Sequence, residues 1–247
     1  MKIMIANPNS NKELTDVLME SARRDIKDTS VELIPFTNPL GSKHIDSVFG
    51  DYQSVWSFVR EILKEIEVVK PDAVVLAGFG NFGMFALKEA LAIPVVPIAE
   101  ASQMIAPMLG HRYSVLTVFN QNIPYQEDLT RLFGIDSRLA SVRGIEMNTD
   151  IVETTDTTKA SLEYTIDKLI HEDGAEVVVL GGARFAPYAQ MLSEKFNIPV
   201  IDPVAVSVKL AILFVESGLS QSKIRKFNYP PQPINDYFVG GVEKENE

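Results

Sequence analysis

The chain has 247 residues, of which 46% are hydrophobic, so it can bury the core of one large or two small α/β domains. Its net charge of -10 repels phosphate backbones and anionic lipid surfaces, which argues against nucleic acid or a membrane as a partner. Because the chain contains no cysteine, disulfides, thiolate metal sites and thiol nucleophiles are excluded. We therefore expect a globular protein that binds a small molecule.

No targeting or membrane segment is expected. The apolar run within residues 1–8 is too short for a signal peptide, and no stretch approaches the ~18 apolar residues of a membrane span. We therefore predict a cytoplasmic protein. The three histidines, His44, His111 and His171, have no close metal-ligand spacing, so we predict neither a metal nor any other cofactor.

Short β-branched runs alternate with amphipathic helical patterns, which is typical of a parallel sheet covered by helices. A helix is predicted between residues 9 and 27, opened by a capping box of Ser10 and Glu13. The proline-rich segment after residue 228 predicts an extended tail, with frayed residues at 243–247. The predicted strands are, in chain order, 2–6, 31–36, 73–77, 95–97, 113–118, 139–144, 176–180 and 200–201.

The chain also resembles itself. Residues 74–78 match residues 178–182 at a spacing of 104, although the similar match of 93–96 with 198–201 could reflect a common way to begin a strand. If the repeat is real, two pseudo-symmetric α/β domains with mainly parallel sheets flanked by helices enclose an active-site cleft. We predict domains at 1–110 and 111–217, and a tail at 218–247 that packs back on the first domain.

A glycine-rich turn, Gly78-Phe79-Gly80-Asn81-Phe82-Gly83, follows a predicted strand and precedes a predicted helix. It fits the G-x-G-x-x-G pattern of dinucleotide-binding folds, and Glu100 falls about where an acidic residue would meet a ribose. Two observations argue against dinucleotide binding: the turn lies on the third strand of its half, and the second turn, 181–184, lacks the spacing. Dinucleotide binding is therefore a distant alternative.

Several collinear motifs over residues 1–237 resemble those of the hydantoin and allantoin racemase branch of the aspartate/glutamate racemase superfamily. The number of motifs in the same order carries the resemblance more than any single one. They are I-x-x-x-N-P-N-S at 3–10, P-x-x-x-x-x-I-x-S at 39–47, V-V-L-A-x-F-G at 74–80, I-P-V-V-x-I-A-E-A at 93–101, V-x-T-x-x-x-x-x-x-P-x-x-E-D at 115–128, I-P-V-I-D-x-V-A at 198–205 and G-L-x-x-S-K at 218–223.

The resemblance implies two pseudo-symmetric α/β domains, a homo-oligomer, and a mechanism in which two cysteines face the α-carbon of the substrate from opposite sides. By motif, those cysteines belong at Gly78 and Gly182, which are glycine in this chain. Glycine provides no base, so racemisation by two thiols should be absent. We expect a cleft enlarged by the two missing side chains. The apolar helix predicted at 204–215 could contribute to an oligomer, although a core helix is the simpler interpretation.

Glu100 and His44 are the candidate catalytic residues. Glu100 could equally serve as a charge at a helix N-terminus, and His44 as an exposed loop residue. The candidate substrate-binding residues are polar side chains or glycine-turn residues that could hold a carboxylate or an imide oxygen. They are Asn7, Ser10, Gly78, Phe79, Gly80, Asn81, Gly182, Ala183 and Arg184.

Purely structural roles are alternatives to several of these functional assignments. Ser10 and Asp202 fit helix caps, Asn81 could satisfy its own backbone, and Arg184 could reach a surface carboxylate instead of clamping a ligand. We predict a cofactor-independent enzyme that acts on a small cyclic ureide or an amino-acid-like carboxylate. The predicted reaction is ring-opening hydrolysis or another reaction that needs no thiol. The alternatives are an isomerase with other acid and base residues, and a member of the family that binds without turnover.

Overall fold

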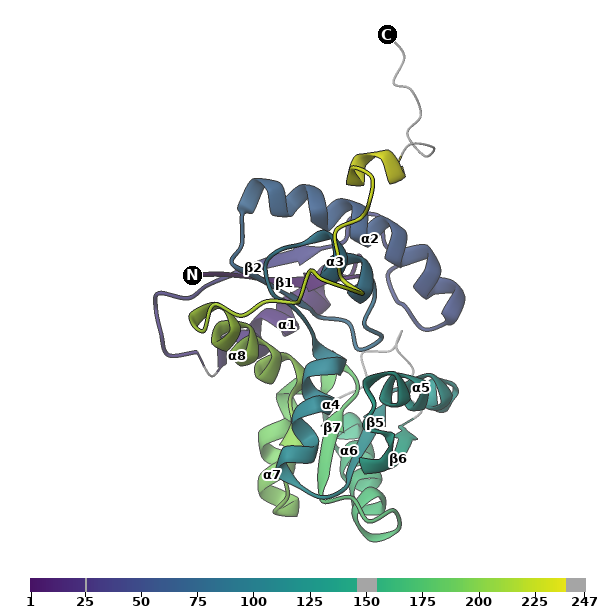
Figure 1. Ribbon diagram of the computed structural model, residues 1–247. Coiled ribbons are helices and arrows are strands. Elements are labelled where there is room, and N and C mark those ends of the chain that lie inside the picture. Colours follow the sequence, from purple (N-terminus) through teal and green to yellow (C-terminus); the bar gives the residue numbers. More distant parts are fainter. Residues whose placement is uncertain (25, 146–154, 239–247) are drawn as a thin grey trace.

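The computed structural model describes residues 1–24, 26–145 and 155–238. Two four-stranded parallel sheets form the centres of two lobes, one above the other in Figure 1. The strand orders are β2-β1-β3-β4 and β6-β5-β7-β8, so the second half repeats the topology of the first. The predicted fold class and internal repeat are therefore confirmed.

The first half alternates strands and helices in the order expected from its sequence pattern. Its strands are β1 (Lys2–Asn7), β2 (Glu32–Thr37), β3 (Ala73–Leu76) and β4 (Val95–Pro97). Its helices are α1 (Lys12–Arg24), α2 (Val48–Val69), α3 (Met84–Ala90) and α4 (Ile98–Leu109).

The second half has the same alternation with additional 3₁₀ turns. Its strands are β5 (Tyr113–Thr117), β6 (Leu139–Gly144), β7 (Val177–Leu180) and β8 (Val200–Ile201). Its helices are α5 (Ile123–Phe133), α6 (Thr155–His171), α7 (Ala189–Phe196) and α8 (Pro203–Glu216), and the 3₁₀ helices are η1 (Asn120–Asn122), η2 (Asp136–Arg138), η3 (Ala183–Tyr188) and, in the tail, η4 (Ile234–Phe238).

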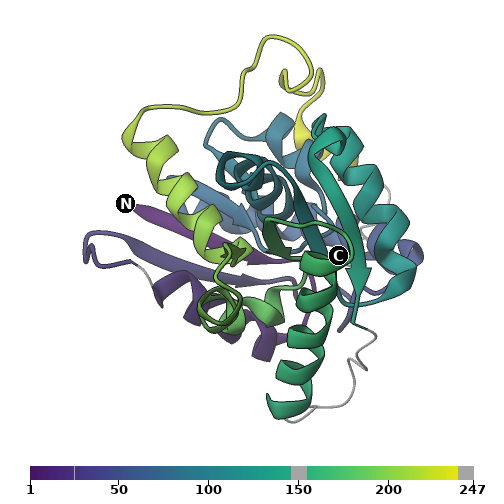
Figure 2. The same cartoon turned by 90° about the horizontal axis from the view of Figure 1, so that it is seen from below.

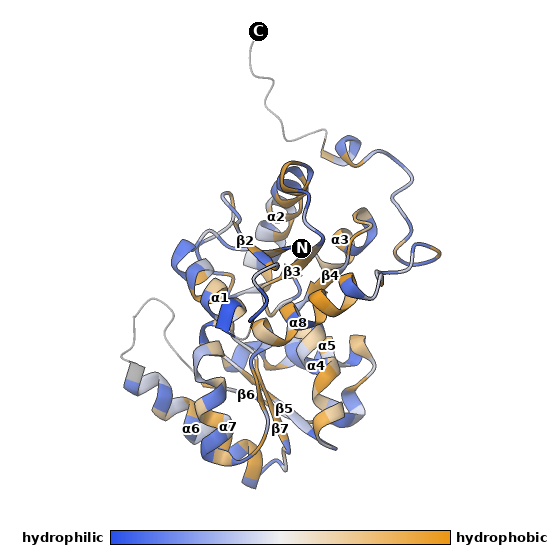
Figure 3. Cartoon of the chain, turned by 90° about the vertical axis from the view of Figure 1, so that its left-hand side faces the viewer, coloured by the Kyte–Doolittle hydropathy of each residue, from blue (hydrophilic) through white to orange (hydrophobic). Residues whose placement is uncertain are grey.

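All eight predicted strands are present, with ends that differ by a residue at most. The strands β3 and β7 are buried along their whole length, as expected of apolar runs with helices on both faces of a parallel sheet. Apolar colours accordingly concentrate on these strands in Figure 3, and helices surround both sheets in Figure 2. Within the described ranges, no helix has the length and apolar character needed to cross a membrane.

One helix from each half packs against the sheet of the other half. α4 contacts β7, whereas α8 contacts β3 and β4 as well as α4 and α1. Asp202 caps α8, as its position suggested, by accepting from the N–H of Val204 and Ala205, and it also accepts a 2.5 Å hydrogen bond from Ser21 of α1. The two halves therefore share a buried interface behind the sheets.

The predicted capping box of Ser10 and Glu13 is wrong. α1 begins at Lys12, and the Asn11 side chain caps it by accepting from the N–H of Leu14 at 3.2 Å. The N–H of Ser10 instead donates to the carbonyl of Ser42. An asparagine is as good a cap as a serine, and the pattern of residue types could not distinguish the two positions.

The C-terminal segment after α8 runs along the outside of the first half, past α3 and α2 (Figure 1). Gln221 anchors it: the side-chain N–H₂ donates to the carbonyls of Leu91 and Ile93, both at 2.7 Å, and the side-chain oxygen accepts from Val95. The segment is extended apart from turns and η4, and residues 239–247 of the predicted tail, including the expected frayed end, lie outside the described residues.

Replacing Gln221 with alanine leaves two carbonyls and one N–H of the first half without their partner. We expect the free energy of unfolding to fall by about 1–3 kcal/mol, because buried polar groups lose their hydrogen bonds. Urea denaturation measures the change. Gln232→Ala, at an exposed position of the same segment, is the matched control, and an equal effect of both variants would contradict this role of Gln221.

Candidate active site

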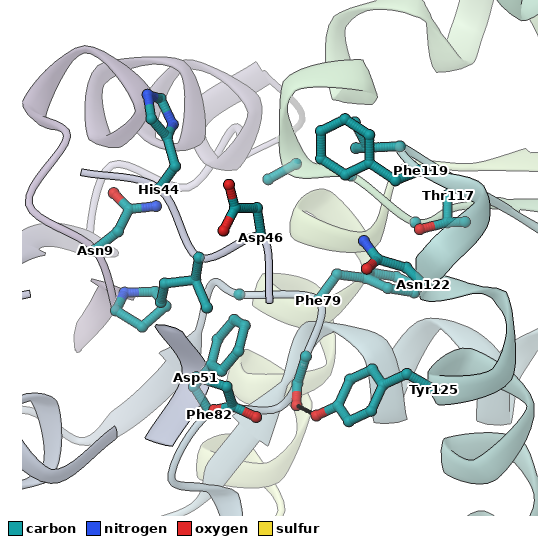
Figure 4. A pocket seen from close by; sticks show the side chains of 18 of the residues that line it. Asn9, His44, Asp46, Asp51, Phe79, Phe82, Thr117, Phe119, Asn122 and Tyr125 are labelled. Carbon is teal, nitrogen blue, oxygen red and sulfur yellow. Dashed lines mark hydrogen bonds between the residues drawn. The ribbon is translucent and has the colours of Figure 1, made fainter. Parts of the chain in front are cut away.

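A pocket of about 390 Å³ lies at the carboxyl ends of the strands, between the two halves. Its size is within the range of small-molecule sites. Both glycine turns line it, together with the loop before α2 and the start of α5 (Figure 4). The lining residues are Pro8, Asn9, Leu14, His44, Ile45, Asp46, Ser47, Val48, Asp51, Ala77, Gly78, Phe79, Gly80, Phe82, Thr117, Val118, Phe119, Gln121, Asn122, Tyr125, Gln126, Gly181, Gly182, Ala183 and Arg184.

The first glycine turn connects β3 to α3 and presents its backbone to the pocket. In the described part of the chain, the N–H groups of Gly78, Phe79 and Gly80 make no hydrogen bond to another backbone or side-chain group. Gly83 takes a φ of 71° at the start of α3, which a glycine adopts without strain. Unused N–H donors at a pocket wall can bind a carbonyl oxygen or an oxyanion.

The Phe82 ring packs over this turn. A Cβ atom built on Gly78 would lie 2.5 Å from Cδ2 of Phe82 and 2.7 Å from Cγ of Pro8, much closer than the ~3.5–4.0 Å at which carbon atoms pack. A Cβ atom on Gly80 would also overlap the Phe82 ring. The expectation of a cleft enlarged at Gly78 is therefore wrong, because an aromatic ring fills the space of the missing side chain.

The second glycine turn is covered in a similar way. A Cβ atom built on Gly182 would lie 2.9 Å from Cε2 of Phe185 and 3.1 Å from Cγ2 of Val118. A Cβ atom on Gly181 would lie 3.2 Å from Cε1 of Phe79, so Phe79 of the first half packs against the turn of the second half. Both turns thus meet aromatic rings at close range, and the two halves touch at the floor of the pocket.

Asp51 is a carboxyl group at the pocket whose pKa is shifted by its surroundings. It lies in the first turn of α2, and the side chain of the N-cap residue Ser47 accepts from the N–H of Gly50. Burial raises the pKa of Asp51, and a hydrogen bond with the Tyr125 hydroxyl opposes that shift. Burial is also the main cause that raises the pKa of Tyr125, whose hydroxyl donates to the carbonyl of Gly80 at 2.6 Å.

The other ionisable groups at the pocket are His44, Asp46 and Arg184. Asp46 is exposed, and its backbone carbonyl accepts from the Gln121 side chain at 3.0 Å, which links the halves across the pocket. Arg184 is half-buried and forms no ion pair with the described residues. Among residues 1–24, 26–145 and 155–238, no three His, Cys, Asp or Glu side chains gather as metal ligands would.

Seven of the predicted site residues line the pocket: His44, Gly78, Phe79, Gly80, Gly182, Ala183 and Arg184. Glu100 lies outside it, at the start of α4, in an ion pair with Lys88. Asn7 is fully buried and its amide donates to Asn11 and Thr15.

Ser10 and Asn81 also lie outside the lining. Asn81 is 6% exposed at a φ of 55°, and its side-chain amide makes no hydrogen bond with the described residues. The four predicted residues that lie away from the pocket thus include one buried side-chain amide, that of Asn81, with no partner among the described residues.

The sequence analysis missed Asp51, Tyr125 and Phe82. Tyr125 lies within the motif at 115–128 but at a variable position, and Asp51 lies outside the motifs, four residues after the one at 39–47. Phe82 lies within the glycine-rich turn at 78–83, at a variable position of the G-x-G-x-x-G pattern. The start of the long helix α2 was the one usable signal, since a helix that begins at the edge of a pocket directs its first turn toward a ligand.

The fold and the pocket define a two-domain α/β protein with a small-molecule cleft between pseudo-symmetric halves. The chain belongs to the Asp/Glu/Hydantoin racemase family, whose model matches residues 3–211. It is similar to the hydantoin racemase of Pseudomonas sp. (strain NS671), with 32% identity over 98% of this chain and 96% of that protein.

Two solved structures have the same fold. The allantoin racemase of Pseudomonas fluorescens aligns with a TM-score of 0.87 and 31% identity, covering 94% of this chain and 98% of that chain. The allantoin racemase of Klebsiella pneumoniae aligns with a TM-score of 0.88 and 25% identity, covering 94% and 95%. The resemblance inferred from the motifs is confirmed.

The packing of Phe82 predicts that Gly78→Cys destabilises the protein by about 1–3 kcal/mol, because the new side chain overpacks the turn. In a Phe82→Ala background, the same substitution should cost less, and the remaining cost should reflect the contact with Cγ of Pro8. Urea denaturation of the four proteins in this double-mutant cycle measures the coupling. The control cycle replaces Phe119, a lining residue that is not among the nearest neighbours of Gly78, and equal coupling in both cycles would contradict the assignment.

Proposed function

We propose that the cleft binds a neutral cyclic ureide of the hydantoin type, and that the protein transfers a proton at the ring carbon beside a carbonyl. The observation that carries the proposal is the Asp51 carboxyl, a partly buried base at the pocket wall next to the glycine turn (Figure 4). The similarity to a hydantoin racemase and to allantoin racemases supports this class of ligand.

The groups around the pocket suit a ring with alternating N–H and C=O groups. The free N–H groups of residues 78–80 can donate to a ring carbonyl, while the carboxylates of Asp46 and Asp51 can accept from ring N–H groups. Two carboxylates against one guanidinium, Arg184, make the pocket unfavourable for a dicarboxylate ligand. A neutral ureide therefore fits the charges better than an acidic amino acid.

Proton transfer follows from the same arrangement. When a base removes the proton from a carbon beside a carbonyl, negative charge develops on the carbonyl oxygen, where backbone N–H donors stabilise it. The raised pKa of Asp51 makes it a stronger base than an ordinary aspartate. The protonated Asp51 carboxyl exchanges its proton with water and then returns a proton to the ring carbon, which restores the C–H bond that was broken and leaves Asp51 ionised again.

The stereochemical outcome depends on which faces of the bound ring have a carboxyl group beside them. Among the described residues, those that the second half contributes to the pocket include threonine, asparagine, glutamine, tyrosine and arginine but no carboxyl group. Asp51 therefore removes and returns the proton on one side of the ring. We expect proton exchange with retention of configuration rather than racemisation, since the chain has no thiol to act on the opposite side.

The test incubates each enantiomer of 5-methylhydantoin with the protein in deuterated buffer and follows the ring C–H signal by ¹H NMR. The protein should accelerate exchange of one enantiomer above the buffer rate, and Asp51→Asn should slow that exchange by about 10²–10⁴-fold. Asp128→Asn, at an exposed position of α5 outside the pocket, is the matched control and should exchange at the wild-type rate.

The same spectra distinguish the competing functions. Appearance of the ring-opened carbamoyl amino acid would contradict proton transfer and favour the hydrolysis suggested by the sequence. Saturable binding of the hydantoin with no exchange above the buffer rate would contradict an enzyme and favour a binding protein. Exchange that persists unchanged in Asp51→Asn would remove Asp51 from the mechanism.

A further inference from the structure

Gln126 of α5 combines deep burial with a place in the wall of the pocket. Only 4% of its surface is exposed, yet it is one of the lining residues. Its side-chain oxygen is buried and accepts no hydrogen bond from residues 1–24, 26–145 or 155–238. A buried amide oxygen without a donor lowers the stability of a protein, so each such group requires an explanation. At the wall of a pocket, a ligand can supply the missing donor.

A buried network behind the pocket holds the backbone of Gln126 in place. The Thr130 hydroxyl lies 2.9 Å from the backbone carbonyl of Gln126 and 2.9 Å from the side-chain oxygen of Gln103 on α4, and it can donate to one of them at a time. The Tyr113 hydroxyl of β5 donates to the same Gln103 oxygen at 3.2 Å. These contacts fix α5 against α4 and β5 but do not involve the side-chain amide of Gln126.

The Gln126 amide is complementary to one edge of a cyclic ureide. A glutamine side chain has an acceptor oxygen and an N–H₂ donor next to each other, and a ureide ring has an N–H donor next to a carbonyl acceptor. Two such groups pair through two hydrogen bonds. The last torsion of a glutamine side chain has a broad energy minimum, so the amide can turn its oxygen toward a ligand while α5 stays in place.

The position of Gln126 in the pocket complements that of the glycine turn. The unused N–H groups of residues 78–80 and the carboxylates of Asp46 and Asp51 belong to the first half. The second half contributes the neutral amides of Gln126 and of Asn122, which lies one helical turn earlier on the same face and also lines the pocket (Figure 4). A neutral ring between the halves therefore meets donors and carboxylates on one side and amides on the other.

We propose that Gln126 is a specificity-determining residue that pairs with the imide edge of a hydantoin. Its side-chain oxygen accepts from the ring N–H between the two carbonyls, and its N–H₂ group donates to the carbonyl farther from the reacting carbon. The carbonyl beside the reacting carbon is then left for the N–H groups of residues 78–80. The inference rests on the proposed function for the class of ligand, but it does not require proton transfer.

The experiment measures the affinities of hydantoin, 3-methylhydantoin and 1-methylhydantoin by isothermal titration calorimetry. The methyl group of 3-methylhydantoin replaces the N–H between the carbonyls, whereas that of 1-methylhydantoin replaces the other ring N–H. The wild type should bind 3-methylhydantoin about 5–150-fold more weakly than hydantoin, because one hydrogen bond is lost and the Gln126 oxygen stays unpaired. Equal affinity of the wild type for these two ligands would overturn the proposal.

Gln126→Met, which keeps the length of the side chain but removes the amide, tests the assignment to this residue. It should bind hydantoin and 3-methylhydantoin with similar affinity, while the effect of the methyl group in 1-methylhydantoin should be the same as in the wild type. Gln190→Met, at an exposed position of α7 outside the pocket, is the matched control and should behave as wild type. A preference for hydantoin over 3-methylhydantoin that survives in Gln126→Met would contradict the proposal.

Urea denaturation without a ligand separates this role from a structural one. Because the described residues give the Gln126 amide no hydrogen bond to lose, Gln126→Met should unfold at the wild-type urea concentration or above it. A clearly lower midpoint would identify Gln126 as a structural residue and overturn the proposal. Discrimination between the ligands without proton exchange would contradict the proposed function alone, whereas exchange without discrimination would contradict the role of Gln126 alone. Absence of hydantoin binding would overturn both.

Discussion

The contact between the Phe82 ring and the backbone of Gly78 and Gly80 determines what the cleft can contain. The ring lies where a side chain at residue 78 would stand, at carbon distances that leave no room for both. A nucleophile or base at residue 78 would therefore require the Phe82 ring to move. The N–H groups of residues 78–80 have no hydrogen-bond partner among the described residues, so the turn keeps donors for a carbonyl oxygen although it has no side chain for chemistry at residue 78.

The pseudo-symmetry of the fold explains why two such turns meet. In each half, the apolar strand β3 or β7 lies between two other strands. A glycine turn follows each of these strands at its carboxyl end. The exchange of α4 and α8 between the halves sets the two edges against each other around the pocket. The symmetry is incomplete at the site: the first half supplies carboxyl groups and the second supplies Tyr125 and Arg184. This difference makes a one-sided proton transfer reasonable.

The sequence predicted the architecture well, because buried parallel strands and helices have strong periodic signals. All eight strands, the repeat and the pairing of Gly78 with Gly182 in one pocket could be derived from pattern alone. The site was harder to predict. Glu100 was a candidate catalytic base by its position after β4, but it pairs with Lys88 and lies outside the pocket lining. Side-chain direction and the packing of Phe82 depend on tertiary contacts that no local pattern contains.

Binding of a cyclic ureide must be compatible with the Phe82 ring, which occupies the space of a side chain at Gly78. A crystal structure of the protein with bound hydantoin would show whether both fit. We expect a ring carbonyl within hydrogen-bonding distance of an N–H of residues 78–80, contact between the ligand and Asp51, and Phe82 still packed on the turn. A hydantoin bound elsewhere, or a Phe82 ring displaced so that the ligand fills the space over Gly78, would contradict it.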